Sequence, residues 1–311
     1  MNSFIYILSE TIDYNKLICD DAGPGYARSM EWASVSLKDL KNVDSKYIYI
    51  IDNRVSENET LALSKIFTNN PLAKFIIKIV DPFLENFDHF YYLWAFKMVT
   101  LDNVNLLSVY ECKELTSFIS KVSGKSIIYA PYPYDQAKEI SLNNLNKRSN
   151  KIIISGSVNG QFYPFRSSIW LKSRRSLSRF LFSILKHPGY AEIHNQDFSH
   201  NYVRDNFIKY LSNYKHMLLC GSRCEIELLK FHECAYAGCL PVGKCPSTFP
   251  EEIKDLFHKL AIKNLFFSTL KYLLTWNKVD HIKNIEIYRK YLRANRSVSE
   301  INKNILSYYK N

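Results

Sequence analysis

Short apolar runs rich in β-branched residues alternate along this chain with longer segments whose apolar residues recur at helical spacing. Such alternation is typical of β-α-β units, which build a parallel sheet with helices packed on its faces. The strand candidates are residues 1–8, 47–52, 74–81, 106–109 and 126–129 in the first half, and 151–155, 190–194, 216–220 and 240–242 in the second. The pattern therefore predicts an α/β protein built on parallel sheets.

The length indicates two domains, because 311 residues exceed the size of one average domain of about 150 residues. Pro131 and Pro133 suit a turn or an extended linker, and the polar run at 143–150 follows them. We expect domains at 1–145 and 146–311, both doubly wound and Rossmann-like. The expected helices are 83–99 and 111–122, then 167–186, 202–214 and 225–236, with terminal helices at 251–276 and 281–309. Two such domains in tandem leave a cleft at the carboxyl ends of their strands, where open α/β sheets bind ligands.

The charge balance favours anionic partners, since the formal net charge is +11. Hydrophobic residues make up 47% of the chain, which excludes a disordered protein. We expect a cytoplasmic protein that is soluble or peripheral, because no apolar stretch approaches the roughly 18 residues that span a bilayer and no signal peptide is recognisable. The seven cysteines are an odd number and read as reduced thiols. Their spacing is not that of a zinc site, the eight histidines form no ligand pattern, and we expect no metal.

The segment 220–244 is the strongest candidate for chemistry, with the sequence CGSRCEIELLKFHECAYAGCLPVGK. A loop that enters a helix presents unpaired N–H groups, and Arg223 and Lys230 beside it would hold a diphosphate. Glu233 lies two turns beyond Glu225 in the expected helix, where it could accept hydrogen bonds from sugar hydroxyls. A plain alternative stays open, namely a surface amphipathic helix in which Glu227 and Lys230 form an ion pair.

These residues resemble a motif of GT-B fold glycosyltransferases. The spacing from Glu225 to Glu233 matches their E-x7-E motif, and Gly238 and Pro241 match the Gly-x-Pro-Val continuation. The resemblance implies that Glu233 binds the ribose of a nucleotide and that Glu225 approaches the donor sugar. It also places basic side chains on the diphosphate, here Lys230 and Arg223.

A second segment points the same way. Residues 154–166 leave an expected strand through a loop that contains Gly156 and enter a helix at Arg166, which can pair with a phosphate in bidentate fashion. The spacing is neither a Walker loop nor GxGxxG. The segment resembles the SG-x(n)-YP-x-R stretch of bacterial transferases related to the CgeB group, as does the HPGY sequence with His187 and Tyr190, which implies a substrate contact. A proline-assisted helix start and a helix stop explain both segments equally simply.

The first half offers a glycine-rich acidic loop at 19–28 ahead of an expected helix. Asp21, or its neighbour Asp20, is a candidate general base for the acceptor. Gly23, Gly25 and Arg28 are candidates for presenting the acceptor across the cleft. Ordinary turn chemistry is the alternative for this loop.

A basic run lies on the polar side of the expected helix 167–186. As a solvated face it needs no function, but it could also contact an anionic membrane that carries a lipid-linked acceptor. We expect no nucleic-acid partner, because no known reader motif is present. The run consists of Lys172, Arg174, Arg175, Arg179 and Lys186.

Together these features predict a glycosyltransferase that moves a sugar from a nucleotide-diphosphate donor to a glycan or other cell-surface acceptor. No Asp-x-Asp occurs, so we expect a metal-independent reaction without a cofactor, in which a helix dipole and cationic side chains stabilise the leaving diphosphate. Two alternatives remain open. One is a nucleotide-sugar epimerase of the same fold, and the other is a non-catalytic module that binds polyanions.

Overall fold

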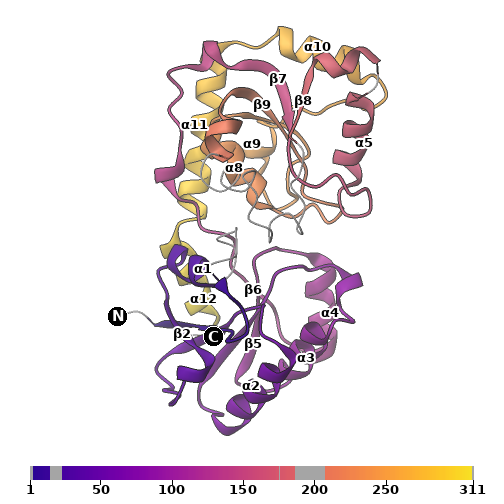
Figure 1. Cartoon of the computed structure of the whole chain (residues 1–311). Helices are drawn as coiled ribbons and strands as arrows, with labels where there is room; N and C mark the ends of the chain where they lie inside the picture. The colour runs from indigo at the N-terminus through magenta and orange to yellow at the C-terminus, as the bar shows by residue number, and fades with distance from the viewer. Residues whose placement is uncertain (1–2, 15–22, 175, 186–206, 310–311) are drawn as a thin grey trace. The chain divides into compact units, whose positions relative to one another are not determined.

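The computed structural model describes residues 3–14, 23–174, 176–185 and 207–309 and divides the chain into two compact units (Figure 1). The first unit comprises Met1–Pro133 and Val298–Asn311, and the second comprises Tyr134–Ser297. Both units contain a parallel sheet and helices, as the sequence predicts.

The first unit has a six-stranded sheet in the order β2-β1-β3-β4-β5-β6, with every pair of neighbours parallel. The central strands consist almost entirely of buried residues, which is why they appear in the sequence as continuous apolar runs. The strands are β1 (Phe4–Leu8), β2 (Ala33–Ser36), β3 (Ile48–Ile51), β4 (Lys74–Ile79), β5 (Val104–Ser108) and β6 (Ile128–Tyr129). The helices are α1 (Gly23–Ser29), α2 (Glu57–Asn69), α3 (Phe90–Met98), α4 (Lys113–Ser123) and α12 (Val298–Tyr308), with short 3-10 turns η2 (Leu37–Asp39) and η3 (Leu84–Asn86).

The second unit has a four-stranded parallel sheet in the order β10-β9-β7-β8. Its strands are β7 (Ser149–Ile154), β8 (Phe182–Ile184), β9 (Tyr214–Leu219) and β10 (Leu240–Gly243). Its helices are α5 (Pro164–Ser173), α8 (Leu229–Ala237), α9 (Glu251–Lys254), α10 (Leu265–Leu274) and α11 (Lys278–Asn295), with 3-10 turns η4 (Gln136–Lys138), η5 (Leu145–Lys147) and η6 (Ser176–Phe180).

Alternating strand residues divide the core of the second unit into two layers. Ile152 and Ile154 of β7 pack with Ile169 of α5 and Leu265 of α10 on one face of the sheet. Ile153 of β7 packs on the other face, in a cluster that includes residues of α8, α9 and α11. Helices therefore cover both faces, and the unit is doubly wound.

The expected helix at 167–186 is wrong beyond its first half. α5 ends at Ser173, the chain forms η6, and Phe182–Ile184 then become the edge strand β8, paired with β7. Apolar residues at helical spacing over so short a stretch fit a strand equally well, and pairing with β7 decided between them. The expected helix at 251–276 is likewise two helices, α9 and α10.

The division between the units lies twelve residues earlier than the expected boundary at 145. Residues after Pro133 belong to the second unit because they bond to the end of α8: Ile140 N donates to Tyr236 O at 2.7 Å, and Arg148 Nη1 donates to Ala237 O at 2.7 Å. A polar run in the sequence marks solvent exposure, but these long-range bonds decide which unit holds the segment.

The expected terminal helix at 281–309 is two helices that belong to different units. α11 packs in the second unit, whereas α12 returns to the first, where Figure 1 shows it in yellow among indigo and purple elements. Two side-chain hydrogen bonds hold α12 in the first unit. Trp32 Nε1 donates to Asn302 Oδ1 at 2.8 Å, and Tyr308 OH donates to Asn105 Oδ1 at 3.2 Å.

The expected strand at 190–194 and most of the expected helix at 202–214 lie outside the described residues. Among the residues that are described, no helix combines the length and the apolar character needed to cross a bilayer.

Candidate functional site

The candidate site of the second unit lies at the carboxyl ends of three neighbouring strands, β7, β9 and β10. The loop after β7 leads into α5, and the loop after β9 leads into α8. In parallel α/β sheets this edge is where ligands bind, because loops and helix N-termini converge there. The geometry of this edge decides which of the sequence candidates come together.

Gly156 brings two of the predicted cations together. Its φ of +88° is a left-handed conformation that favours glycine. A Cβ atom on this residue would lie 3.0 Å from Arg166 Nη1 and 3.2 Å from Lys230 Cε. Gly156, Arg166 and Lys230 therefore form a cradle in which two basic side chains approach the same stretch of backbone, and we refer to these three residues as the Gly156 cradle.

Arg166 is the most unusual side chain of the cradle because it is almost completely buried, with 2% of its surface exposed. Its Nη1 donates to Ser157 O at 2.9 Å, and the guanidinium lies 4.7 Å from the centre of the Tyr163 ring. Nε and Nη2 are buried without a hydrogen-bond partner among the described residues. Because an unsatisfied buried cation is costly, these donors indicate a place for an anion.

Lys230 and Glu233 line the first turns of α8. Lys230 Nζ lies 2.7 Å from Glu233 Oε2, and both side chains are about four-fifths buried, at 22% and 19% exposure. Leu228 at the N-cap makes no side-chain hydrogen bond, and the first turn carries no acidic residue. The positive end of α8 is therefore left without a side-chain cap at this edge.

The structure corrects the expected helix at 225–236. α8 begins at Leu229, and Glu225 lies in the preceding turn with a φ of +53°, a conformation that cannot continue an α-helix. Ile226 N donates to Gly221 O at 2.6 Å and closes this turn, so Glu225 and Glu233 do not lie two turns apart on one helix. The seven-residue spacing joins a loop residue to a helix residue instead.

Arg223 lies in the same turn and links two of the loops. Its backbone N–H donates to Phe162 O at 2.8 Å, and its guanidinium lies 5.7 Å from the centre of the Phe162 ring. The loop after β9 is thereby fixed against the loop after β7. Arg223 is half-buried and belongs to the same edge as the Gly156 cradle.

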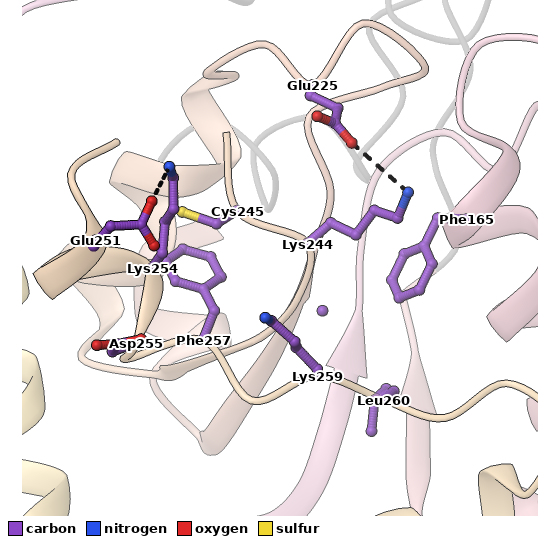
Figure 2. Close-up of a pocket in the computed structure, with 11 residues that line it drawn as sticks. Phe165, Glu225, Lys244, Cys245, Glu251, Lys254, Asp255, Phe257, Lys259 and Leu260 are labelled. Carbon is purple, nitrogen blue, oxygen red and sulfur yellow. Dashed lines mark hydrogen bonds and ion pairs between the residues drawn. The ribbon is translucent and has the colours of Figure 1, made fainter. Parts of the chain in front are cut away.

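A cavity of about 390 Å³ opens at the end of β10 (Figure 2). Phe165, Phe257 and Leu260 supply apolar walls, and Lys244 and Glu225 point toward each other with 3.8 Å between Nζ and Oε1. The cavity adjoins the cradle along the chain, since Phe165 precedes Arg166. It combines an apolar floor with charged groups of both signs, as a site for a polar organic molecule would.

Cys245 lines the cavity but is not a nucleophile at neutral pH. Burial raises the pKa of its thiol to about 12, so the thiol is protonated.

Sequence reasoning missed the partner of Glu227. The alternative interpretation, a surface ion pair with Lys230, is wrong, because the fully buried Glu227 accepts from Arg296 Nη2 at 2.7 Å and bonds to His232 Nε2 at 2.9 Å. Although burial raises the pKa of Glu227, hydrogen bonds from His232 and the charge of Arg296 hold it below its ordinary value. Arg296 lies far along the chain, so no local pattern could identify it.

The first unit contains only part of the predicted acceptor loop within the described residues. Asp20 and Asp21 lie outside them, as do His187 and Tyr190 in the second unit. Gly23, Gly25 and Arg28 were expected in a loop, but they form α1, in which Arg28 is exposed in the last turn. The helix starts there because the Gly23 amide donates to Asp52 Oδ2 at 2.9 Å, a contact that supplies the first turn with an acceptor.

Asp52 and Lys78 form a buried charged cluster that sequence reasoning also missed. Asp52 follows β3 and Lys78 belongs to the neighbouring β4, and neither side chain is exposed. Lys78 Nζ lies 3.6 Å from the centre of the Tyr26 ring, and Tyr14 OH donates to Asp52 Oδ2 at 3.2 Å. Burial raises the pKa of Asp52, and the charge of Lys78 opposes that shift. The signal was a lysine within an otherwise apolar strand.

Neither a protein-family model nor a curated protein matches the chain. Solved structures do match. A mutant of S. aureus TarM in complex with fondaparinux, α-GlcNAc-glycerol and UDP gives a TM-score of 0.52 at 15% identity over 88% of this chain. The pneumococcal O-GlcNAc transferase GtfA in complex with UDP and GlcNAc gives 0.47 at 13% identity over 86%. This chain covers 57% of the length of each. The likeness to the TarM structure confirms the predicted fold, two Rossmann-like α/β domains of the GT-B type.

Proposed function

We propose that this protein is a glycosyltransferase that moves a sugar from a nucleotide-diphosphate donor to a glycan or other cell-surface acceptor. One observation carries the proposal: the buried guanidinium of Arg166 has two donors without partners in the described part of the chain, and it lies beside Lys230 over the backbone of Gly156. The GT-B type fold supports the proposal, and so does the place of the cradle at the carboxyl edge of the sheet. The CgeB-like type stays a prediction.

The proposed ligand of the Gly156 cradle is the diphosphate of the donor. Phosphate oxygens accept from a guanidinium in a fork geometry. Arg166 Nε and Nη2, which have no partner in the ranges that the structure describes, match that geometry, and Lys230 adds a second positive charge. The uncapped start of α8 adds backbone N–H groups and the positive end of a helix dipole. Arg223 completes the basic edge. Together they would stabilise the charge of the leaving diphosphate, and we propose that no metal and no cofactor take part.

The acidic residues would bind the sugars of the donor. By resemblance to the E-x7-E motif, Glu233 accepts from the ribose hydroxyls, and Lys230 exchanges its contact with Glu233 for a phosphate when the donor binds. Glu225 lines the cavity next to Lys244. This pair suits a donor sugar with several hydroxyl groups, because the carboxylate accepts hydrogen bonds and the neighbouring ammonium group donates them.

The acceptor side belongs to the first unit in this proposal. Asp21 would act as general base, with Gly23, Gly25 and Arg28 beside the acceptor and His187 and Tyr190 as further substrate contacts. These assignments are predictions from the sequence. The acceptor would be a glycan or a lipid-linked sugar.

Binding of the free nucleotides tests the proposal directly. Thermal unfolding is measured with UDP, GDP, CMP and dTDP, and one nucleoside diphosphate should raise the unfolding temperature, because a ligand at 100 times its Kd stabilises the native state by about 2.7 kcal/mol. Lys230→Gln should weaken binding of that nucleotide about tenfold or more. Lys290→Gln is the matched control, since Lys290 is exposed on α11.

The outcomes separate the proposal from its alternatives. If no nucleotide changes the unfolding temperature, or if Lys290→Gln weakens binding as much as Lys230→Gln, the diphosphate assignment is wrong. Strongly salt-dependent affinity for any polyanion, without preference for a nucleotide, indicates a polyanion-binding module instead. Release of free nucleotide with transfer of the sugar to an added glycan separates a transferase from an epimerase.

A further inference from the structure

One face of the second unit combines exposed apolar side chains with basic ones. It consists of α5, η6 and α10, and η6 contacts both helices. Lys172 Nζ of α5 donates to Ile262 O at 2.9 Å, just before α10, so the segments form one continuous surface. We call this surface the α5–α10 face.

Large apolar side chains on the α5–α10 face lack cover from the described residues. Phe267 and Leu274 lie two turns apart on one side of α10, with 73% and 76% of their surfaces exposed. The exposed apolar residues are Leu171 at 47%, Leu177 at 59%, Phe180 at 56%, Phe267 and Leu274. Soluble proteins rarely expose so many large apolar residues together unless the surface binds a partner.

The charges on this face are of one sign. Lys172, Arg174 and Arg179 are exposed among the apolar residues of α5 and η6, and Lys263 and Lys271 are exposed at α10. No Asp or Glu occurs in the sequence between Glu139 and Glu192, and none between Asp255 and Asp280. Every segment that forms this face therefore lacks an acidic residue, which suits an anionic partner.

Two arginines lie along aromatic rings at this surface. The Arg174 guanidinium lies 4.7 Å from the centre of the Trp170 ring, and that of Arg179 lies 4.8 Å from the Phe180 ring. Each such pair presents an aromatic ring and a charged guanidinium at the same place on the surface. It suits the boundary between lipid headgroups and acyl chains, where both groups find partners.

We propose that the α5–α10 face docks on the surface of an anionic lipid bilayer. The basic side chains contact the headgroups, and Leu177, Phe180 and Phe267 enter the acyl boundary. A nucleic acid would satisfy the charges but would leave these apolar side chains in water, which is why a bilayer fits better. The sequence suggested membrane contact from the basic run alone; the apolar residues and the contribution of α10 come from the tertiary structure.

Vesicle co-sedimentation of the full chain tests the apolar part. The protein should bind vesicles of phosphatidylglycerol and phosphatidylcholine, and it should bind pure phosphatidylcholine vesicles about tenfold or more weakly. The variant Leu177→Ser/Phe180→Ser/Phe267→Ser should lose about tenfold or more of this binding. The control Leu61→Ser/Leu72→Ser/Leu93→Ser removes three equally exposed residues from the first unit and should bind as the wild type does.

A second pair of variants tests the charges. Arg174→Glu/Arg179→Glu should reduce binding about tenfold or more at low salt, whereas Lys113→Glu/Lys121→Glu makes the same charge change on exposed residues of α4 and should have little effect. Circular dichroism and the unfolding temperature establish that each variant is folded.

The proposal is overturned if the wild type does not bind the anionic vesicles, or if each control variant loses as much binding as its partner. It is also overturned if duplex DNA is bound and the triple serine variant keeps full affinity for DNA and for vesicles. None of these outcomes bears on the nucleotide site. Arg166 belongs to α5 but is buried, so it is not among the exposed side chains of this face, and the response of the unfolding temperature to nucleotides is measured separately.

Discussion

The two units place buried cations at the same edge of similar sheets, but they surround them differently. Lys78 in the first unit is enclosed by Tyr6 and Tyr26 and opposed by the carboxyl of Asp52. Arg166 in the second unit is almost as deeply buried, yet two of its donors lack a partner within the described chain. Burial alone therefore does not mark a functional cation. A charge whose partners the protein supplies stabilises the fold, and a charge without them points to a ligand.

The largest expected effect is a difference in the free energy of unfolding between two variants, each of which lacks one of the buried cations. Lys78→Met should lower the free energy of unfolding by about 3 kcal/mol, because it removes the stronger of the two positive charges, those of Lys78 and Arg54, that act on the buried Asp52 carboxyl. Arg166→Met should cost less than about 1 kcal/mol in the absence of nucleotide, because the loss of its contacts to Ser157 and Tyr163 is offset by removal of two unsatisfied donors. Urea unfolding of both variants measures the difference.

Two further variants make that comparison sharper. The double variant Asp52→Asn/Lys78→Met should recover part of the stability lost in Lys78→Met, since neither member of the pair is then charged. An equal cost of Arg166→Met and Lys78→Met would mean that Arg166 is as structural as Lys78, and the ligand assignment would fail.

Acid should destabilise the second unit before the first. Burial lowers the pKa of His216 to about 3 and that of His281 to about 4, and the hydrogen bond between His281 and Gly238 O opposes the second shift without cancelling it. Below about pH 6.5 the two histidines bind protons in the unfolded chain but stay neutral in the folded one. The free energy of unfolding is therefore highest above about pH 6.5 and falls as the pH decreases. By pH 5 each histidine should cost about 2 kcal/mol. The raised pKa of Asp52 has the opposite effect on stability as the pH falls, because the folded first unit binds this proton more readily than the unfolded chain does.

Hydrogen exchange measured at pH 7 and pH 5 resolves the two units and checks this order. Protection should fall in β9 and α11 and change less in β3 and β4. His216→Asn should remove part of the pH dependence. Equal loss of protection in both units would contradict the contrast.

Two glycines with similar backbone conformations should differ in nucleotide binding but not in stability. Gly156 and Gly124 have φ values of +88° and +70°, so alanine at either should cost about 1–2 kcal/mol. A Cβ on Gly124 meets no atom within 4 Å, whereas one on Gly156 crowds Arg166 and Lys230. Gly156→Ala should therefore weaken nucleotide binding as well, and Gly124→Ala should not. Calorimetric titration with the responding nucleotide checks this, and unchanged binding by Gly156→Ala would count against the cradle.

The sequence predicted the strands of both sheets better than the helices. Runs such as those of β3 and β4 stand out because both faces of a central parallel strand are buried, so the signal is local. The stretch after α5 was ambiguous, because Phe182–Ile184 can pack as a helix or pair as a strand. Of the candidate site, Gly156, Arg166 and Lys230 were identified from loop chemistry and resemblance. Asp52, Lys78 and the Arg296 contact of Glu227 were not, because their partners lie on other elements.

Local sequence patterns are enough to predict that this chain forms parallel α/β units, and they identify the basic and acidic residues near the ends of the second sheet. Periodicity and composition suffice for that, because they act between residues close in the chain. Long-range packing places Glu225 in a turn and makes residues 298–308 part of the first unit. It also leaves two donors of Arg166 without a partner among the described segments. Whether a charged group is satisfied depends on atoms from distant segments, and packing alone brings those atoms together.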